Sequence, residues 1–239
     1  MKLIFALRHW TPRPWALPCR ALPCLALLCF CGALLPGQQP PPPEAPKEPT
    51  RAQAWETLTQ HVQSVALRRH ALAVEAATAA YARVYGEDEE RWRVVALLHD
   101  FDYELHPTLD GHPQEGAPIL RSAGYPEDVI EAVLSHAEHL GLPRDTRLKQ
   151  VLFACDELSG FLHACGLVRP DGIETLEPKS VRKKLKQPSF ASGVSRGDVY
   201  KGAEDLGVDL DEHIAFVIEA LRPIAPELGL RTAQDVPAA

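Results

Sequence analysis

The stretch VVALLHD, residues 94–100, combines a run of five apolar residues with two side chains that can bind a metal ion. A helix that is apolar on most of its surface is buried in the protein core. We therefore expect this helix to deliver His99 and Asp100 at its buried end. The pair also has an ordinary explanation, as a hydrogen-bonded core histidine followed by a carboxylate at a helix end.

The residues around this stretch repeat with the period of helices. From Ala54 onward, apolar residues recur every three or four positions, and the alternating pattern of half-buried strands is missing. Glycines such as Gly86 and Gly207 follow several of these segments, as is typical of helix ends. We predict an all-α fold with helices at about residues 53–65, 67–85, 88–100, 113–123, 127–139, 145–166, 178–186, 197–206 and 210–228.

Three further residues of the metal-binding type occupy apolar helical surroundings. His70 lies beside the apolar face of LRRHALAVEAATAAYA, and His136 ends the apolar segment VIEAVLSH. Asp156 lies in VLFACDELSGFL, where burial of an unpaired carboxylate would be unfavourable. A metal ion would balance that charge and engage the imidazoles at the same time. The combination favours a metal site over isolated core histidines.

Eight segments of the chain together resemble a known family. In sequence order they are LRRHALAVEAA, VVALLHDFDYE, HPQEGAPIL, VLSHAE, FACDELSGF, LVRP, KSVRKKLK and FASGVSR. They are similar to a bacterial branch of the HDIG-type metal-dependent phosphohydrolases of the HD superfamily. The similarity covers residues 51–231 and implies a single HD-domain helical bundle with a C-terminal helical extension.

The resemblance also implies one or two bound divalent metal ions. A first ion would be held by four residues, His70, His99, Asp100 and Asp156. His112 and His136 would complete a second site, with Asp100 bridging the two ions and acting in catalysis together with His99. Imidazole and carboxylate ligands without a thiolate favour manganese, iron, cobalt, nickel or magnesium over a structural zinc. Asp102, Glu104 and Glu138 are further carboxylates near these ligands.

The expected activity is hydrolysis of a small phosphorylated substrate, a nucleotide, by a water molecule that the metal activates. Two alternatives remain open. Other HD-type proteins hold two irons and are oxygenases, and metal content and redox behaviour would separate that chemistry from hydrolysis. A nucleotide-binding regulatory module with little turnover is the second alternative, although the full set of six ligand residues argues against it.

The segment KSVRKKLK, residues 179–186, carries five cations on about two helical turns. Such a run is either a solvated helix face or an anion clamp beside the metal ions. The clamp would assign substrate binding to Lys183, Lys184 and Arg196. The chain has a net charge of -7, so binding of bulk nucleic acid is disfavoured.

The first fifty residues have a different composition from the rest. Basic residues precede the apolar run 21–35, which has the length of a signal-peptide core and is short for a membrane span. Residues 1–50 are therefore either a signal-like segment or a spurious extension translated from upstream of the true start, and they end in a proline-rich linker at 38–50.

The remaining expectations concern the tail and the cell compartment. We expect residues 232–239 to be disordered and the domain to contain no membrane span. Cys155 and Cys165 are expected to be free thiols, which suits a cytoplasmic location, whereas a true signal segment would mean export or membrane anchoring. The sequence does not determine the oligomeric state.

Overall fold

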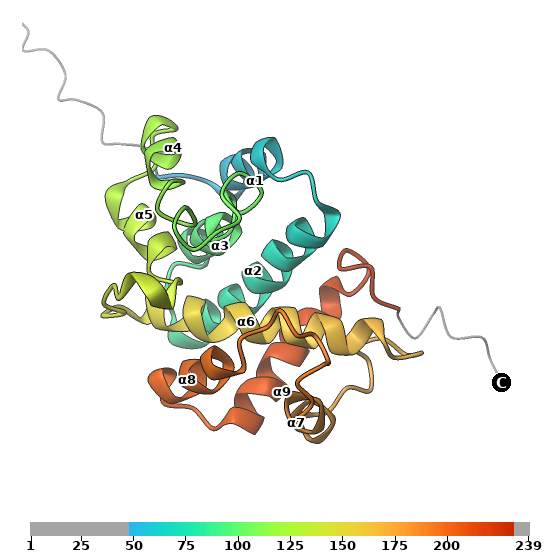
Figure 1. Ribbon diagram of the computed structural model, residues 1–239. Coiled ribbons are helices and arrows are strands. Elements are labelled where there is room, and N and C mark those ends of the chain that lie inside the picture. The colour runs from blue at the N-terminus through green and yellow to red at the C-terminus, as the bar shows by residue number, and fades with distance from the viewer. Residues whose placement is uncertain (1–47, 232–239) are drawn as a thin grey trace, which may run out of the picture. The chain divides into compact units, whose positions relative to one another are not determined.

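The computed structural model describes residues 48–231, and every regular element within this range is helical (Figure 1). The predicted all-α fold is thereby confirmed. The predictions made for residues 1–47 and 232–239 lie outside the described residues. The helices are α1 Arg51–His61, α2 Val65–Tyr85, α3 Glu89–Leu98, α4 Ala117–Ser122, α5 Glu127–Leu134, η1 Glu138–Leu140, α6 Arg147–Leu167, α7 Pro178–Leu185, α8 Arg196–Leu206, α9 Leu210–Leu221 and η2 Arg222–Ile224.

Side-chain caps set the starting points of the long helices. Ser64, Asp88 and Thr146 each accept a hydrogen bond from a backbone N–H in the first turn of α2, α3 and α6, respectively. These bonds satisfy donors that have no partner inside the helix. At the other end of α2, Gly86 adopts a left-handed conformation with φ of 67°, which glycine adopts without steric strain.

Three helices are at least five residues shorter than the sequence predicted, and each has a local reason. The segment 113–123 is helical only in α4, because residues 109–116 form turns. Helix α5 ends at Leu134, because the side chains of Ser135 and His136 donate to backbone carbonyls of the preceding turn and compete with the helical pattern. Helix α9 ends at Leu221, since Pro223 has no N–H to continue it.

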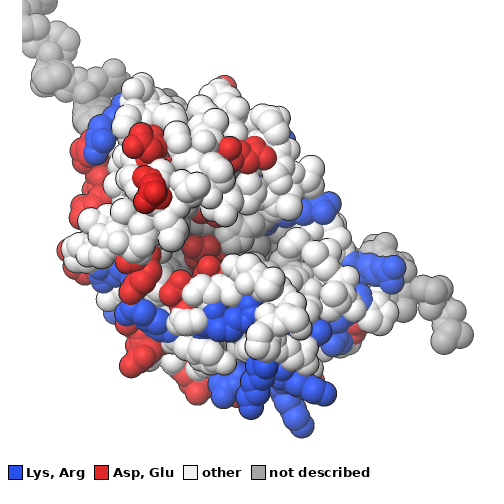
Figure 2. Space-filling view, viewed as in Figure 1, with Lys and Arg blue, Asp and Glu red and all other residues white. Residues whose placement is uncertain are grey.

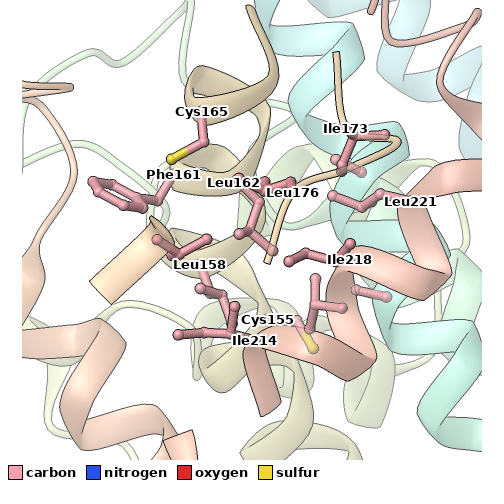
Figure 3. Close-up of a cluster of buried hydrophobic side chains, with 14 of the residues drawn as sticks. Cys155, Leu158, Phe161, Leu162, Cys165, Ile173, Leu176, Ile214, Ile218 and Leu221 are labelled. Carbon is pink, nitrogen blue, oxygen red and sulfur yellow. The ribbon is translucent and has the colours of Figure 1, made fainter. Parts of the chain in front are cut away.

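Two clusters of buried apolar side chains hold the helices together, and α2 and α6 contribute to both. One cluster joins them to α1, α3, α4 and α5. The other joins them to α7, α8 and α9 and includes the side chains around Phe161 and Ile218 (Figure 3). In Figure 1, α2 and α6 cross the middle of the molecule between these two groups of helices. Residues on α2 and α6 can therefore meet residues from either group.

Helices α6 and α8 approach each other very closely at Gly202. A Cβ atom added to this glycine would lie 2.6 Å from the Cα atom of Ala154. Real Cβ atoms do not come so close to a backbone atom, so only glycine fits without a shift of the helices. This contact fixes the position of α8, and of the loop that leads into it, relative to α6.

Two observations bear on the expected compartment. Cys155 and Cys165 are both free and buried, as predicted. Between residues 48 and 231, no helix is both long enough and apolar enough to cross a membrane. The cytoplasmic location itself stays a prediction.

Candidate metal centre

Residues from α2, α6, the ends of α3 and α5, and the turns between α3 and α4 meet at one site. Four of them, His70, His99, Asp100 and Asp156, have ligand atoms that all lie within 4.8 Å of one another. The same holds for a second set, Asp100, His112 and His136. The structure therefore brings together all six residues that the sequence singled out as metal ligands.

The first set has the spacing of ligands around one ion. The Nε2 atom of His70 lies 3.0 Å from Oδ1 of Asp156, 3.2 Å from Nε2 of His99 and 3.5 Å from Oδ2 of Asp100. Two ligand atoms that are each ~2.1 Å from the same ion lie roughly 3.0–3.4 Å apart. The observed distances fit this spacing.

Asp100 belongs to both sets and presents a different oxygen to each. Its Oδ2 faces His70 and His99, whereas its Oδ1 lies 3.2 Å from Nε2 of His112 and 3.4 Å from Nε2 of His136. The Nε2 atoms of His112 and His136 are themselves 3.2 Å apart. A carboxylate in this position can bridge two ions.

Hydrogen bonds on the far side of three imidazole rings fix their orientation. His99 and His136 each donate from Nδ1 to the backbone carbonyl three residues earlier, Ala96 and Val133, at 2.7 Å. His112 donates from Nδ1 to Oδ1 of Asp102 at 2.8 Å. Because these acceptors hold the ring proton on Nδ1, the Nε2 lone pairs are free to bind a metal.

The carboxylates noted in the sequence have three different roles. Asp102 is fully buried and orients His112, as just described. Glu104 accepts hydrogen bonds from the backbone N–H groups of Gln63 and Ser64, so it supports the start of α2. Glu138 pairs with Arg144 at 2.7 Å. Only Asp102 contacts a residue of the ligand cluster.

The electrostatic environment keeps the two ligand carboxylates ionised. Burial acts to raise the pKa of Asp100, but the neighbouring imidazoles of His99, His112 and His136 outweigh it and hold this pKa well below its ordinary value. Burial also acts to raise the pKa of Asp156, and His99 and His70 likewise lower it overall. Ionised carboxylates are the form that binds metal ions.

The cluster opens into a cavity of about 650 Å³. Figure 2 shows this hollow near the centre of the view, with acidic residues in it. Besides the ligands, the cavity is lined by Tyr103, Leu109, Ala137, Glu138, His139, Phe153, Glu157, Gly160, Gly193, Val194 and Asp198. A volume of this size accommodates a small organic ligand.

Glu157 is a cavity residue that the sequence analysis did not single out. Burial raises its pKa to about 7, and the neighbouring charge of Asp156 adds to this effect. Its Oε2 accepts a hydrogen bond from the backbone N–H of Ser195, the residue that caps α8. Its place directly after Asp156 is the only signal in the sequence, and consecutive helical residues point about 100° apart.

The residues predicted to form an anion clamp do not line the cavity. Lys183 is exposed on α7, and the Nζ atom of Lys184 lies 4.0 Å from the ring centroid of Phe190. Arg196 donates to backbone carbonyls of the loop before α8, those of Gln187, Phe190, Ala191 and Val194. It therefore shapes the loop that brings Gly193 and Val194 into the cavity wall. Substrate binding by these three cations stays a prediction.

Comparison with known proteins identifies the region that carries the cluster. Residues 67–160 match the family model of the HD domain, and this range contains all six ligand residues. Ribonuclease Y of Oleidesulfovibrio alaskensis is 27% identical over 127 residues, which are 53% of this chain and 23% of that protein. The chain thus matches less than a quarter of the length of this curated relative. No solved structure gives a significant match.

Proposed function

Because residues 67–160 of this chain form an HD domain, the domain of a superfamily of metal-dependent phosphohydrolases, we propose that the protein hydrolyses a small phosphate ester. The observation that carries this proposal is the position of Asp100 between two sets of imidazoles, with one oxygen toward each. A carboxylate shared in this way is suited to holding two divalent ions close together.

The residues present fit such ions. The rings of His99 and His136 donate from Nδ1 to backbone carbonyls, which leaves their Nε2 atoms to face the ligand cluster, and Asp100 and Asp156 are held ionised. The thiol of Cys155 is buried in the apolar cluster of α6 and is not part of the ligand sets. This donor set suits manganese, iron, cobalt, nickel or magnesium. When bound, such an ion polarises phosphoryl oxygens and makes a water molecule more acidic near neutral pH.

The side chains around the site have different roles in the proposed reaction. His70, His99 and Asp156 form one side of the centre and His112 and His136 the other, with Asp100 shared between them. Asp102 holds the ring of His112 in place from behind. The apolar side chains of the cavity, Tyr103, Leu109, Phe153 and Val194, offer a surface for the alcohol part of the substrate.

The proposed substrate class rests on the volume of the cavity and the net charge of the chain. The relative is named a ribonuclease, but this chain has a net charge of -7, which disfavours a long polyanion. The cavity of about 650 Å³ suits a small molecule. We therefore propose a small phosphorylated substrate, with nucleotides as the first compounds to test.

The test is a hydrolysis assay on the full chain with p-nitrophenyl phosphate and a set of nucleotides. We expect phosphate release from protein loaded with Mn²⁺, Co²⁺ or Ni²⁺ and none after chelation, because the ligand cluster is the chemical apparatus of the site. Absence of phosphate release with every metal would contradict the proposal. Oxygen consumption by the iron-loaded protein under the same conditions would favour the oxygenase alternative instead.

A further inference from the structure

We propose that the cavity selects phosphomonoesters whose alcohol part carries hydroxyl or ammonium groups, and that it disfavours substrates with a second negatively charged group. This inference rests on the proposed function. It concerns which esters bind, and it comes from the charges around the cavity beyond the metal ligands.

The wall of the cavity is acidic outside the ligand set. It contains three further carboxylates, Glu138, Glu157 and Asp198. Among the described residues that line it there is no lysine and no arginine. Enzymes that bind substrates with several phosphates commonly use lysine and arginine side chains to hold the phosphate groups.

Two arginines of the surrounding segments, Arg144 and Arg196, are bound to protein groups. Arg144 donates to the backbone carbonyl of Ser135 and to Glu138, and its guanidinium stacks on Phe153 at 3.4 Å from the ring centroid. It therefore pairs with Glu138 but is not among the residues that line the cavity. Arg196 is bound to loop carbonyls, as described above.

Of the three carboxylates in the cavity wall, Glu157 and Asp198 remain after Glu138 has paired with Arg144. No lysine or arginine of residues 48–231 forms an ion pair with either of them. Glu157 comes from α6 and Asp198 from the first turn of α8, so they approach the cavity from two elements that Gly202 holds in close contact. Their positions are thus fixed by the packing of the fold.

This distribution of charge has a direct consequence for binding. Divalent ions held by the six ligand residues would supply positive charge inside the cavity, and one phosphate group of a substrate would bind there. A second phosphate or a carboxylate would face Glu157 and Asp198, and like charges at short range weaken binding. Hydroxyl or ammonium groups would instead donate hydrogen bonds to these carboxylates, and such charge-assisted bonds are strong.

Three small phosphomonoesters test the inference directly. O-phosphoethanolamine, glycerol 3-phosphate and 3-phosphoglycerate are similar in size, and their alcohol parts are cationic, neutral and anionic, respectively. Binding to the Mn²⁺-loaded full chain is measured by calorimetry, with the three esters compared in the same buffer. We expect 3-phosphoglycerate to bind about tenfold more weakly than glycerol 3-phosphate, and phosphoethanolamine at least as tightly as glycerol 3-phosphate.

Variants connect this preference to the two carboxylates. In the double variant Glu157→Gln, Asp198→Asn, the difference between glycerol 3-phosphate and 3-phosphoglycerate should fall to about threefold or less, since repulsion is removed. Glu204→Gln, at an exposed position on α8, is the control and should keep the wild-type ratio. Thermal melting of each variant verifies that it is folded.

The outcomes separate the two proposals. Equal binding of all three esters by the wild type, or an unchanged ratio in the double variant, would overturn the charge-selection inference and leave the hydrolase proposal standing. Failure of every ester to bind, together with no hydrolysis of p-nitrophenyl phosphate, would overturn both.

Discussion

Replacement of Asp100 by Asn is expected to lower kcat for phosphate-ester hydrolysis by about three orders of magnitude and to reduce the bound metal. Metal ions contribute several kcal/mol to phosphoryl chemistry, and each ~1.4 kcal/mol is a tenfold change in rate. Asn has nearly the same shape as Asp but no charge, and its amide nitrogen cannot replace a ligand oxygen. Because Oδ1 and Oδ2 face different imidazole sets, either orientation of the amide disrupts one set.

The test measures the metal content of the purified variant and its initial rate of phosphate-ester hydrolysis. Asp110→Asn is the matched control, since Asp110 is exposed in the same region of turns and does not belong to the ligand cluster. It should retain wild-type activity and metal content. Undiminished hydrolysis by Asp100→Asn would be incompatible with the proposed mechanism.

The second large effect concerns stability. Gly202→Ala should lower the free energy of unfolding by about 1–3 kcal/mol, because its Cβ would overlap the backbone of Ala154 and force α6 and α8 apart. This loss is expected even though alanine favours helix formation over glycine by ~1 kcal/mol. A loss of stability in this variant would therefore come from the close helix contact, because helix propensity alone would raise stability.

Urea denaturation compares this variant with Gly197→Ala on the same helix. A Cβ at Gly197 would have only the Ser195 side chain near it, at 3.8 Å, so this control should be neutral or stabilised by up to ~1 kcal/mol. If both variants changed stability equally, the close packing of α8 on α6 would not be a determinant of the fold.

The helical fold and five of the six clustered residues leave local signals in the sequence, whereas His112 could be predicted only from the family resemblance. The three- and four-residue spacing of apolar residues identifies helices, and His99, Asp100, His136 and Asp156 stand out as polar residues at the ends or within apolar segments. The HD domain is confirmed by the family match. Metal binding by the six residues stays a prediction, although their side chains lie together as it requires.

The features that could not be predicted depend on side-chain bonds to nearby backbone or on contacts between distant segments, and apolar periodicity reveals neither. His136 lies after α5 because its ring donates to the carbonyl of Val133, a local choice that periodicity does not reveal. Arg196 donates to loop carbonyls and is not among the residues that line the cavity. The exposure of Glu157 to the cavity depends on how α8 packs on α6, which is a tertiary property.

Crystals of the full chain grown with Mn²⁺ and measured at the manganese absorption edge test the central claim most directly. The account predicts an anomalous peak among His70, His99, Asp100 and Asp156, with ligand distances of about 2.1–2.3 Å, and allows a second between Asp100, His112 and His136. Anomalous peaks only at other sites, with the six side chains hydrogen-bonded to one another and no ion between them, would contradict it.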